Sequence, residues 1–200
     1  MATYGVWKVW RYAILYAVPG RVYDELLDIA FDQYGYVSSR DARAAGVDPR
    51  RLVEMERRGT LERVAHGLYR FPAVPTSDLD QLMEATMWPR GQGVVSHDSA
   101  LDVYDLCDVS PRRIHVTVPM SFRLWRTPPR AFVVHRRDLN ERDIGRHEGI
   151  AIVSPFQAIR DGIEEHLGDH LLDQAIEAGR RRGMLSRQQL DELRAARDGT

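Results

Sequence analysis

Apolar side chains recur at helical spacing in the first amphipathic segment of the chain, residues 22–33. The positions that fall on one face are Leu26, Leu27, Ala30 and Phe31. Gly35 follows and is placed to end the run. The segment is therefore predicted to form a helix with one buried face.

A second, shorter helix is predicted directly after it. Ser38 and Asp41 have the three-residue spacing of a capping pair, and small apolar residues follow them. Gly46 stands where the C-terminus of a helix favours glycine. The second helix is therefore short, and a tight turn follows it.

A third helix is predicted over residues 49–58. Asp48 offers an N-cap carboxylate, and Pro49 suits the first helical position because its missing N–H would have no intrahelical partner. Leu52 and Met55 lie on one face, while arginine and glutamate side chains occupy the rest. One face is thus suited to packing, and the other is strongly cationic.

Two short strands are predicted next, at residues 61–64 and 68–71, around a turn at 65–67. Three helices followed by such a hairpin are the order of a winged helix-turn-helix. From residue 38 to residue 71 the chain has eight arginines and five acidic residues. This local excess of positive charge, in a chain whose net charge is −1, is typical of a surface that faces nucleic-acid phosphates.

The first residues of a recognition helix meet base edges in the major groove, and the third helix holds that place. Arg50 and Arg51 are candidates for guanine contacts, and Glu54 is a candidate for a cytosine amino group. Further DNA-binding candidates at the start of the second helix are Ser38, Ser39 and Arg40. The candidates for contacts to the DNA backbone are Arg57, Arg58, Arg63, His66 and Arg70. A protein-docking surface and a merely solvated arginine face are the alternative interpretations.

The rest of the chain has the pattern of a small α+β domain that ends in helices. The predicted helices cover residues 77–87, begin at Ser96 and at Ser154, and cover residues 169–182 and 186–197. The predicted strands cover residues 114–118, 131–135 and 149–153. Ser96 is expected to cap its helix, and Gln157 to complete a capping box with Ser154. The fold class is therefore α+β, with an N-terminal extension at 1–20, a winged helix-turn-helix at 21–73 and an α+β domain at 74–200.

Composition narrows the chemistry and the location. Cys107 is the single cysteine of the 200 residues, which excludes an internal disulfide and a multi-thiolate zinc site and suits a reducing cytoplasm. Lys8 is the only lysine, so phosphate-loop, protein-kinase and Schiff-base lysines are excluded. Lys8 and Arg11 interrupt the apolar residues of 4–18, so this segment is not expected to be a membrane span or a signal peptide. It is interpreted as an amphipathic helix or as an extension with no ordered role. We expect a cytoplasmic protein.

A second basic segment lies at residues 111–137, which contain no acidic residue. Its arginines are Arg112, Arg113, Arg123, Arg126, Arg130, Arg136 and Arg137. The segment is interpreted either as a solvated sheet edge or as a second contact surface, for DNA or for an acidic protein partner.

No pattern of residues predicts catalysis, a metal site or a cofactor. Ser96, His97 and Asp98 are consecutive, and neighbouring residues at a helix start point in different directions, so they are not expected to form a relay. Gly168 interrupts the spacing of His166 and His170. The pairs His135 with Asp138 and His147 with Glu148 have no spacing that singles them out as ligands. The protein is expected not to be an enzyme.

Two sets of residues carry a resemblance to a known family. The first surrounds the predicted wing: Gly59, Leu61, Arg63, Gly67, Leu68, Tyr69 and Arg70. The second comprises Ser96, His97, Ser99, Ala100, Leu101, Leu106, Ile114, His115, Val116, Thr117, Val118, Pro119, Ser154, Pro155, Asp161, Gly183, Leu185 and Leu190. In this order they resemble the AbiEi antitoxins of bacterial abortive-infection toxin–antitoxin pairs, over residues 22–193. The chain departs from the family before Asp161, where the family often has a threonine–leucine pair and this sequence has Ala158, Ile159 and Arg160.

The resemblance implies two functions. The winged helix would bind inverted repeats in the promoter of its own operon and repress transcription. The C-terminal domain would counteract a co-encoded nucleotidyltransferase-like toxin, and the manner of that action stays open between direct binding and an enzymatic modification of the toxin such as serine phosphorylation. The implied partners are double-stranded operator DNA and the toxin.

Overall fold

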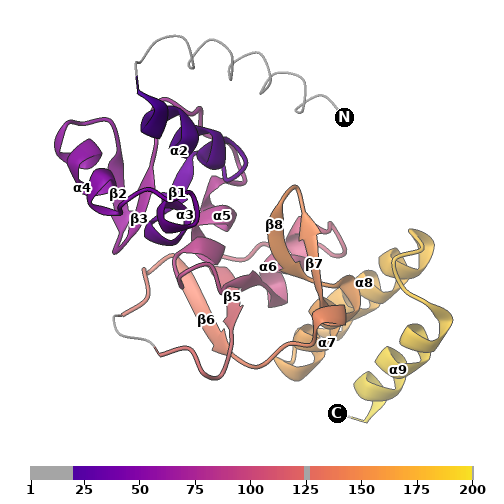
Figure 1. The fold of residues 1–200 in the computed structure, drawn as a ribbon. Coiled ribbons are helices and arrows are strands. Elements are labelled where there is room, and N and C mark those ends of the chain that lie inside the picture. Colours follow the sequence, from indigo (N-terminus) through magenta and orange to yellow (C-terminus); the bar gives the residue numbers. More distant parts are fainter. Residues whose placement is uncertain (1–19, 124–126, 200) are drawn as a thin grey trace. The chain divides into compact units, whose positions relative to one another are not determined.

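The computed structural model describes residues 20–123 and 127–199, and the chain divides into two compact units between Arg90 and Gly91 (Figure 1). Both units combine helices with a sheet, so the predicted α+β class is confirmed. The amphipathic helix considered for residues 4–18 lies outside the described residues, as does nearly all of the predicted N-terminal extension. Within the described ranges, no helix is long and apolar enough to cross a membrane.

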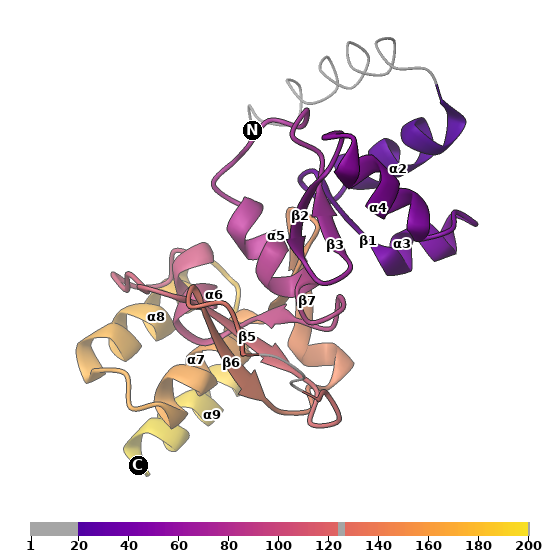
Figure 2. The same ribbon diagram turned by 90° about the vertical axis from the view of Figure 1, so that its left-hand side faces the viewer.

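The first unit has the order of elements that a winged helix-turn-helix requires (Figure 2). Its elements are α2 (Arg21–Phe31), β1 (Tyr36–Ser38), α3 (Ser39–Ala44), α4 (Arg50–Arg57), β2 (Glu62–Ala65), β3 (Leu68–Arg70) and α5 (Asp80–Met87). The strands form an antiparallel sheet in the order β1-β3-β2, with β3 in the centre. The sequence predicted the three helices and the hairpin, but it did not predict β1.

The ends of the short helices are fixed by the residues that the sequence singled out. Ser38 and Asp41 form a capping box at α3, in which the Asp41 carboxylate accepts hydrogen bonds from both the Ser38 backbone N–H and its hydroxyl, each at 2.7 Å. Gly46 ends α3 with a φ of +72°, a conformation that glycine adopts without strain. The Asp48 carboxylate accepts a hydrogen bond of 2.9 Å from the Arg50 N–H and so caps the start of α4.

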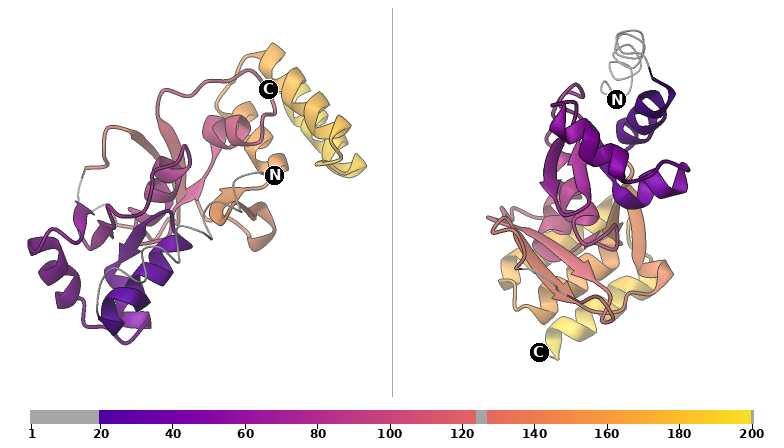
Figure 3. Two further views of the ribbon diagram at one scale, coloured as in Figure 1. Left: turned by 90° about the horizontal axis from the view of Figure 1, so that it is seen from above. Right: turned by 60° about the vertical axis from the view of Figure 1, so that its left-hand side comes forward.

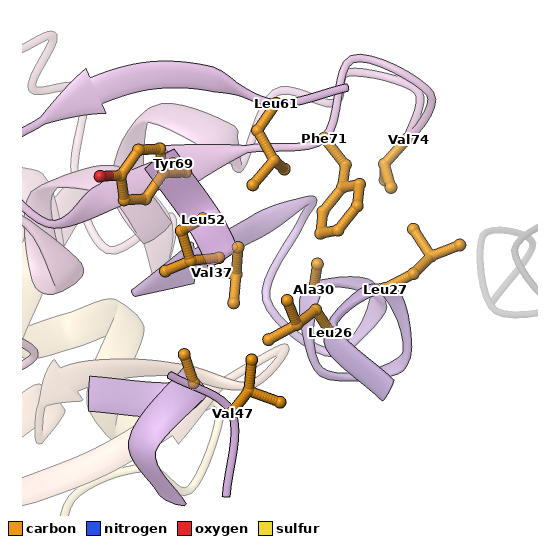
Figure 4. Close-up of a cluster of buried hydrophobic side chains, with 11 residues drawn as sticks. Leu26, Leu27, Ala30, Val37, Val47, Leu52, Leu61, Tyr69, Phe71 and Val74 are labelled. Atoms are coloured by element: carbon orange, nitrogen blue, oxygen red, sulfur yellow. The ribbon is translucent and has the colours of Figure 1, made fainter. Parts of the chain in front are cut away.

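A single apolar cluster holds this unit together (Figure 4). It takes side chains from α2, β1, α3, α4, β3 and the connecting segments: Leu26, Leu27, Ala30, Val37, Ala42, Val47, Leu52, Leu61, Tyr69, Phe71 and Val74. Leu52 is fully buried and anchors α4 to the cluster. Met55 is partly buried and packs against the same cluster, so the opposite face of this short helix faces solvent.

The tip of the β2–β3 hairpin is attached to the start of α3. The Gly67 carbonyl accepts a hydrogen bond of 2.8 Å from the Ser39 N–H. Gly67 has a φ of +73°, and a Cβ added there would lie 3.2 Å from the Ser39 hydroxyl oxygen. Glycine at this position therefore permits both the turn and the close contact.

Helix α5 packs on β1 and belongs to the first unit, which extends to Arg90. The Tyr36 hydroxyl, on β1, donates a hydrogen bond of 3.3 Å to the Glu84 carboxylate of α5. Burial raises the pKa of Glu84, while the hydrogen bond from Tyr36 lowers it to a smaller extent. The boundary at residue 73 stays a prediction for the DNA-binding domain itself.

The second unit is a mixed five-stranded sheet with helices packed on it (Figure 3). Its strands are β4 (Val94–Val95), β5 (Ile114–Val118), β6 (Phe132–Arg136), β7 (Ile144–His147) and β8 (Ile150–Val153), in the order β6-β5-β4-β8-β7. Its helices are α6 (His97–Val103), α7 (Pro155–Glu164), α8 (Asp169–Arg181) and α9 (Arg187–Asp198), with the 3-10 turn η1 (Glu141–Asp143). Helix α6 packs on β5 and α7, and α7 packs on α8 and α9. Strands β4 and β7 were not predicted.

Two of the predicted caps in this unit need correction. Ser96 stands at the N-cap position of α6, but its side chain makes no hydrogen bond to the helix backbone. Instead its hydroxyl oxygen lies 2.8 Å from both the Thr117 hydroxyl oxygen and His97 Nδ1. Ser154 does accept a hydrogen bond from the Gln157 N–H, whereas the Gln157 side chain donates to Asp161, at 2.7 Å. Both polar side chains are diverted from the helix ends to a buried polar network.

Candidate nucleic-acid interface

Helix α4 presents the cationic face that its sequence predicted. Leu52 lies in the core, whereas Arg50, Arg51, Arg57 and Arg58 are exposed. The helix-turn-helix geometry places Arg50 and Arg51 on the first turn of α4, where a recognition helix meets base edges. Their assignment to guanine stays a prediction.

Arg51 and Glu54, both predicted to contact bases, contact each other. Arg51 Nη1 lies 2.7 Å from Glu54 Oε2 across one helical turn, and both side chains are about half exposed. An exposed pair of this kind contributes at most about 1 kcal/mol to stability, so it can open when DNA offers better partners. The pair fixes the side-chain geometry of the free protein without removing either group from the surface.

Several arginines around α4 are free of such pairing. In the described ranges, no ion pair involves the exposed residues Arg40, Arg43, Arg50, Arg57 and Arg58. Unpaired guanidinium groups keep their full charge available for phosphate oxygens. Arg43, which lies on α3, adds to the candidates that the sequence named.

The wing contributes a smaller polar group. Arg63 Nη2 lies 3.4 Å from His66 Nδ1, and Arg63 Nε donates a hydrogen bond of 3.4 Å to the Ala65 carbonyl. Arg63 and His66 are both exposed. They are therefore accessible at the tip of the hairpin, and their DNA-backbone contacts stay a prediction.

Two of the predicted DNA contacts are engaged inside the unit. Arg70 Nη2 lies 2.9 Å from Asp80 Oδ2 and donates to the Val74 carbonyl at 3.0 Å, and only about a tenth of the Arg70 and Asp80 side chains is exposed. Arg70 thus joins β3 to α5 and is not placed to grip a phosphate. The Ser38 hydroxyl is likewise used by its capping box with Asp41. The prediction that Arg70 and Ser38 contact DNA is therefore corrected, and both residues have structural roles.

The second basic segment divides into surface and internal positions. The exposed arginines are Arg112, Arg113, Arg123, Arg130 and Arg136, and Arg126 lies outside the described residues. Arg136 donates to the Met120 carbonyl. Arg137 pairs with the fully buried Asp161 and with Glu164, at 3.1 Å, and is therefore an internal counter-ion. The segment keeps a cationic surface, but without Arg137.

The structure brings no serine–histidine–aspartate relay together from residues 96–98. The carboxylate that faces His97 is that of Asp161, whose Oδ2 lies 3.5 Å from His97 Nδ1, and Ser96 Oγ approaches the same ring nitrogen. A relay requires the serine and the carboxylate on opposite ring nitrogens. This arrangement orients the imidazole but does not activate Ser96.

The fold and the basic face define the first unit as a winged helix-turn-helix of the nucleic-acid-binding class. Residues 24–72 match the family model described as "Transcriptional regulator, AbiEi antitoxin". The match confirms the resemblance to AbiEi antitoxin regulators for this segment of the chain.

The similarity of fold extends over both units. The crystal structure of the RV2827C protein from Mycobacterium tuberculosis is similar to 88% of this chain, over 72% of its own length, with 17% sequence identity and a TM-score of 0.50. At this identity the likeness concerns the fold alone. No curated protein sequence matches the chain.

Proposed function

We propose that this protein is an antitoxin that also represses its own operon. Its winged helix-turn-helix would bind an inverted repeat in its promoter, with one copy of the protein on each half-site and the half-sites about one helical turn apart or a multiple of it. The observation that carries this proposal is the exposed arginine face of α4, where Arg50 and Arg57 form no ion pair, within the segment that matches antitoxin regulators.

The second unit is proposed to counteract a co-encoded nucleotidyltransferase-like toxin. Its exposed arginines at 112, 113, 123, 130 and 136 provide a cationic surface for an acidic partner. We propose that this action is not enzymatic and needs no cofactor, and that the protein works in the cytoplasm. The proposed route is direct neutralisation of the toxin, and enzymatic modification of the toxin is the alternative that experiment separates from it.

The repressor proposal is tested by binding the full chain to DNA from upstream of its own gene, at two salt concentrations, against an excess of random duplex. A shifted complex that survives the competitor supports a sequence-specific repressor. Complete loss of the complex to random DNA would refute specificity, because phosphate contacts alone give salt-sensitive and sequence-independent binding.

The action on the toxin is tested by incubating toxin and antitoxin with and without nucleotide and measuring both masses. An unchanged toxin mass together with a stable complex supports direct neutralisation. A mass increase that requires both the antitoxin and the nucleotide would contradict the proposal that the protein is not an enzyme.

A further inference from the structure

Three histidines far apart in the sequence meet on one side of the second unit. His97 begins α6, His115 lies in β5 and His135 lies in β6. Strands β5 and β6 are parallel, with His115 opposite Val133 and Thr117 opposite His135. Alternate residues of a strand point to the same face, so His115 and His135 share one face of the sheet. The Ser96 N–H donates to the His115 carbonyl at 3.0 Å and so holds the start of α6 beside β5.

One pair of ring nitrogens lies at the separation of two ligands of one metal ion, and a nitrogen of the third ring lies nearby. One nitrogen from each of the three rings lies within 4.8 Å of the other two, and His135 Nε2 lies 3.2 Å from His115 Nδ1. Zinc is bound by imidazole at about 2.0–2.1 Å in tetrahedral sites, which places two ligand nitrogens about 3.3 Å apart. The rings of His97 and His135 are stacked, with centroids 3.6 Å apart, so His135 must turn out of this stack to direct its lone pair at an ion.

A carboxylate stands at the open side of the cluster. Glu165 Oε1, at the end of α7, lies 4.0 Å from His97 Nε2 and 3.7 Å from His135 Nδ1. It is the other nitrogen of His135, Nε2, that faces His115, so the His135 ring must turn before one nitrogen can face both groups. The Glu165 side chain is 55% exposed, whereas His97 is buried and the other two histidines are partly buried. The cluster can therefore be reached from solvent past a side chain that is itself a metal ligand in many proteins.

Buried polar groups contact Nδ1 of His97 and orient its ring. Its Nδ1 faces Ser96 Oγ at 2.8 Å and Asp161 Oδ2 at 3.5 Å, which leaves Nε2 for the cluster. Asp161 is in turn held by Gln157 and Arg137. Metal-binding histidines almost always have a carboxylate or another acceptor on the second ring nitrogen, which fixes the tautomer. His97 also has a φ of +54°, a costly conformation for a residue with a side chain, and such conformations cluster at functional sites.

We propose that His97, His115, His135 and Glu165 form a tetrahedral binding site for a divalent transition metal, with Zn²⁺ as the preferred ion. The ligand set of three imidazoles and one carboxylate suits zinc better than calcium or magnesium, which prefer oxygen ligands. The ion would join α6, β5, β6 and α7 at one point.

The electrostatics of the cluster agree with this assignment. Burial, followed by the neighbouring imidazoles of His135 and His115 and by Arg137, lowers the pKa of His97 to about 3. Burial is also the main cause that lowers the pKa of His115 and of His135. Burial therefore disfavours positive charge on each of the three rings.

The experiment uses the full chain, without a purification tag, after removal of metal by a chelator. Titration with Zn²⁺ in a calorimeter is expected to give one equivalent per chain. Titration with Co²⁺ is expected to give the intense visible bands of tetrahedral coordination. Absence of stoichiometric Zn²⁺ binding, or weak bands typical of six-coordinate Co²⁺, would overturn the proposal.

Variants assign the ligands. His115→Gln and His135→Gln are each expected to abolish the intense Co²⁺ bands, while His170→Gln, which changes an exposed histidine outside the cluster, leaves them unchanged. Circular dichroism establishes that each variant is folded. Glu165→Gln changes a half-exposed side chain, so it keeps the proposal testable if the histidine variants unfold. This substitution is expected to shift the Co²⁺ bands and to weaken Co²⁺ binding. Bands that persist in His115→Gln and His135→Gln, or that do not change at all in Glu165→Gln, would show that the ion binds elsewhere.

Discussion

Arg70 and Asp80 form the buried ion pair of the first unit, with Arg70 Nη2 and Asp80 Oδ2 2.9 Å apart and about nine-tenths of each side chain covered. Arg70 also donates to the Val74 and Pro75 carbonyls at 3.0 and 3.4 Å. The pair therefore joins the last residue of the wing to the first residue of α5, across the segment that links them. Arg70, which the sequence predicts to contact DNA, thus stabilises the fold of the first unit.

Replacing Arg70 with alanine is expected to lower the free energy of unfolding by about 3 kcal/mol, because it leaves the Asp80 carboxylate buried without a counter-ion. Chemical denaturation measures the effect. Arg63→Ala, an exposed substitution on the same hairpin, is the control and should change the stability by less than about 0.5 kcal/mol. Equal denaturation midpoints for wild type and Arg70→Ala would contradict this role.

Replacing Arg50 or Arg51 with alanine is expected to weaken binding to the operator by about 1–3 kcal/mol and to relax the base preference. Binding to random DNA should fall much less. Competition mobility shifts measure both affinities, with Arg180→Ala as a control because Arg180 is an exposed arginine of the second unit. Losses of equal size on operator and random DNA would assign these two arginines to the backbone instead.

Arg57 and Arg58 are expected to act on phosphates. The double substitution to alanine should weaken binding to all sequences alike and reduce the slope of log affinity against log salt by about 0.9 for each phosphate that the protein no longer neutralises. Fluorescence anisotropy over a series of salt concentrations measures the slope. An unchanged slope, even with weaker binding, would exclude direct phosphate contacts by these side chains.

Glu84→Gln is expected to stabilise the protein at neutral pH. Burial raises the pKa of Glu84 in the folded state, so the unfolded chain ionises first as pH rises and folding loses stability until the folded-state pKa is passed. A tenfold change in proton affinity corresponds to about 1.4 kcal/mol. The advantage of the variant should vanish well below pH 4.5, where both states hold the proton. Thermal unfolding across pH checks this, with the exposed substitution Glu62→Gln as control, and an advantage that grows at low pH would refute it.

Local signals in the sequence were sufficient to predict most helices and the hairpin. The capping box at Ser38 forms as its spacing indicates, and β5 has its predicted bounds. In contrast, β1 is three residues long and acquires its strand conformation by pairing with β3, some thirty residues later. A strand that short has too little alternation to be recognised from its own residues.

The candidate site was predictable to the extent that its residues are close in sequence. Arg50, Arg51 and Arg57 lie on one helix, and their exposure follows from the burial of Leu52 on its other face. Asp80, the partner of Arg70, lies beyond the predicted domain boundary at residue 73, so the sequence did not indicate the ion pair between them. The histidines at 97, 115 and 135 have no ligand spacing along the chain, because a helix start and two paired strands bring them together. Such a cluster becomes apparent only once the strand register is known.

The hydrogen bond between the Ser39 N–H and the Gly67 carbonyl bears on the thermodynamics of recognition. It attaches the tip of the wing to the start of α3, the helix that precedes the recognition helix α4. The conformational entropy of the wing is therefore lost when the domain folds, and association with a duplex requires little further ordering of this segment. We thus expect the heat-capacity change on DNA binding to reflect the buried contact area, without the excess that accompanies coupled folding.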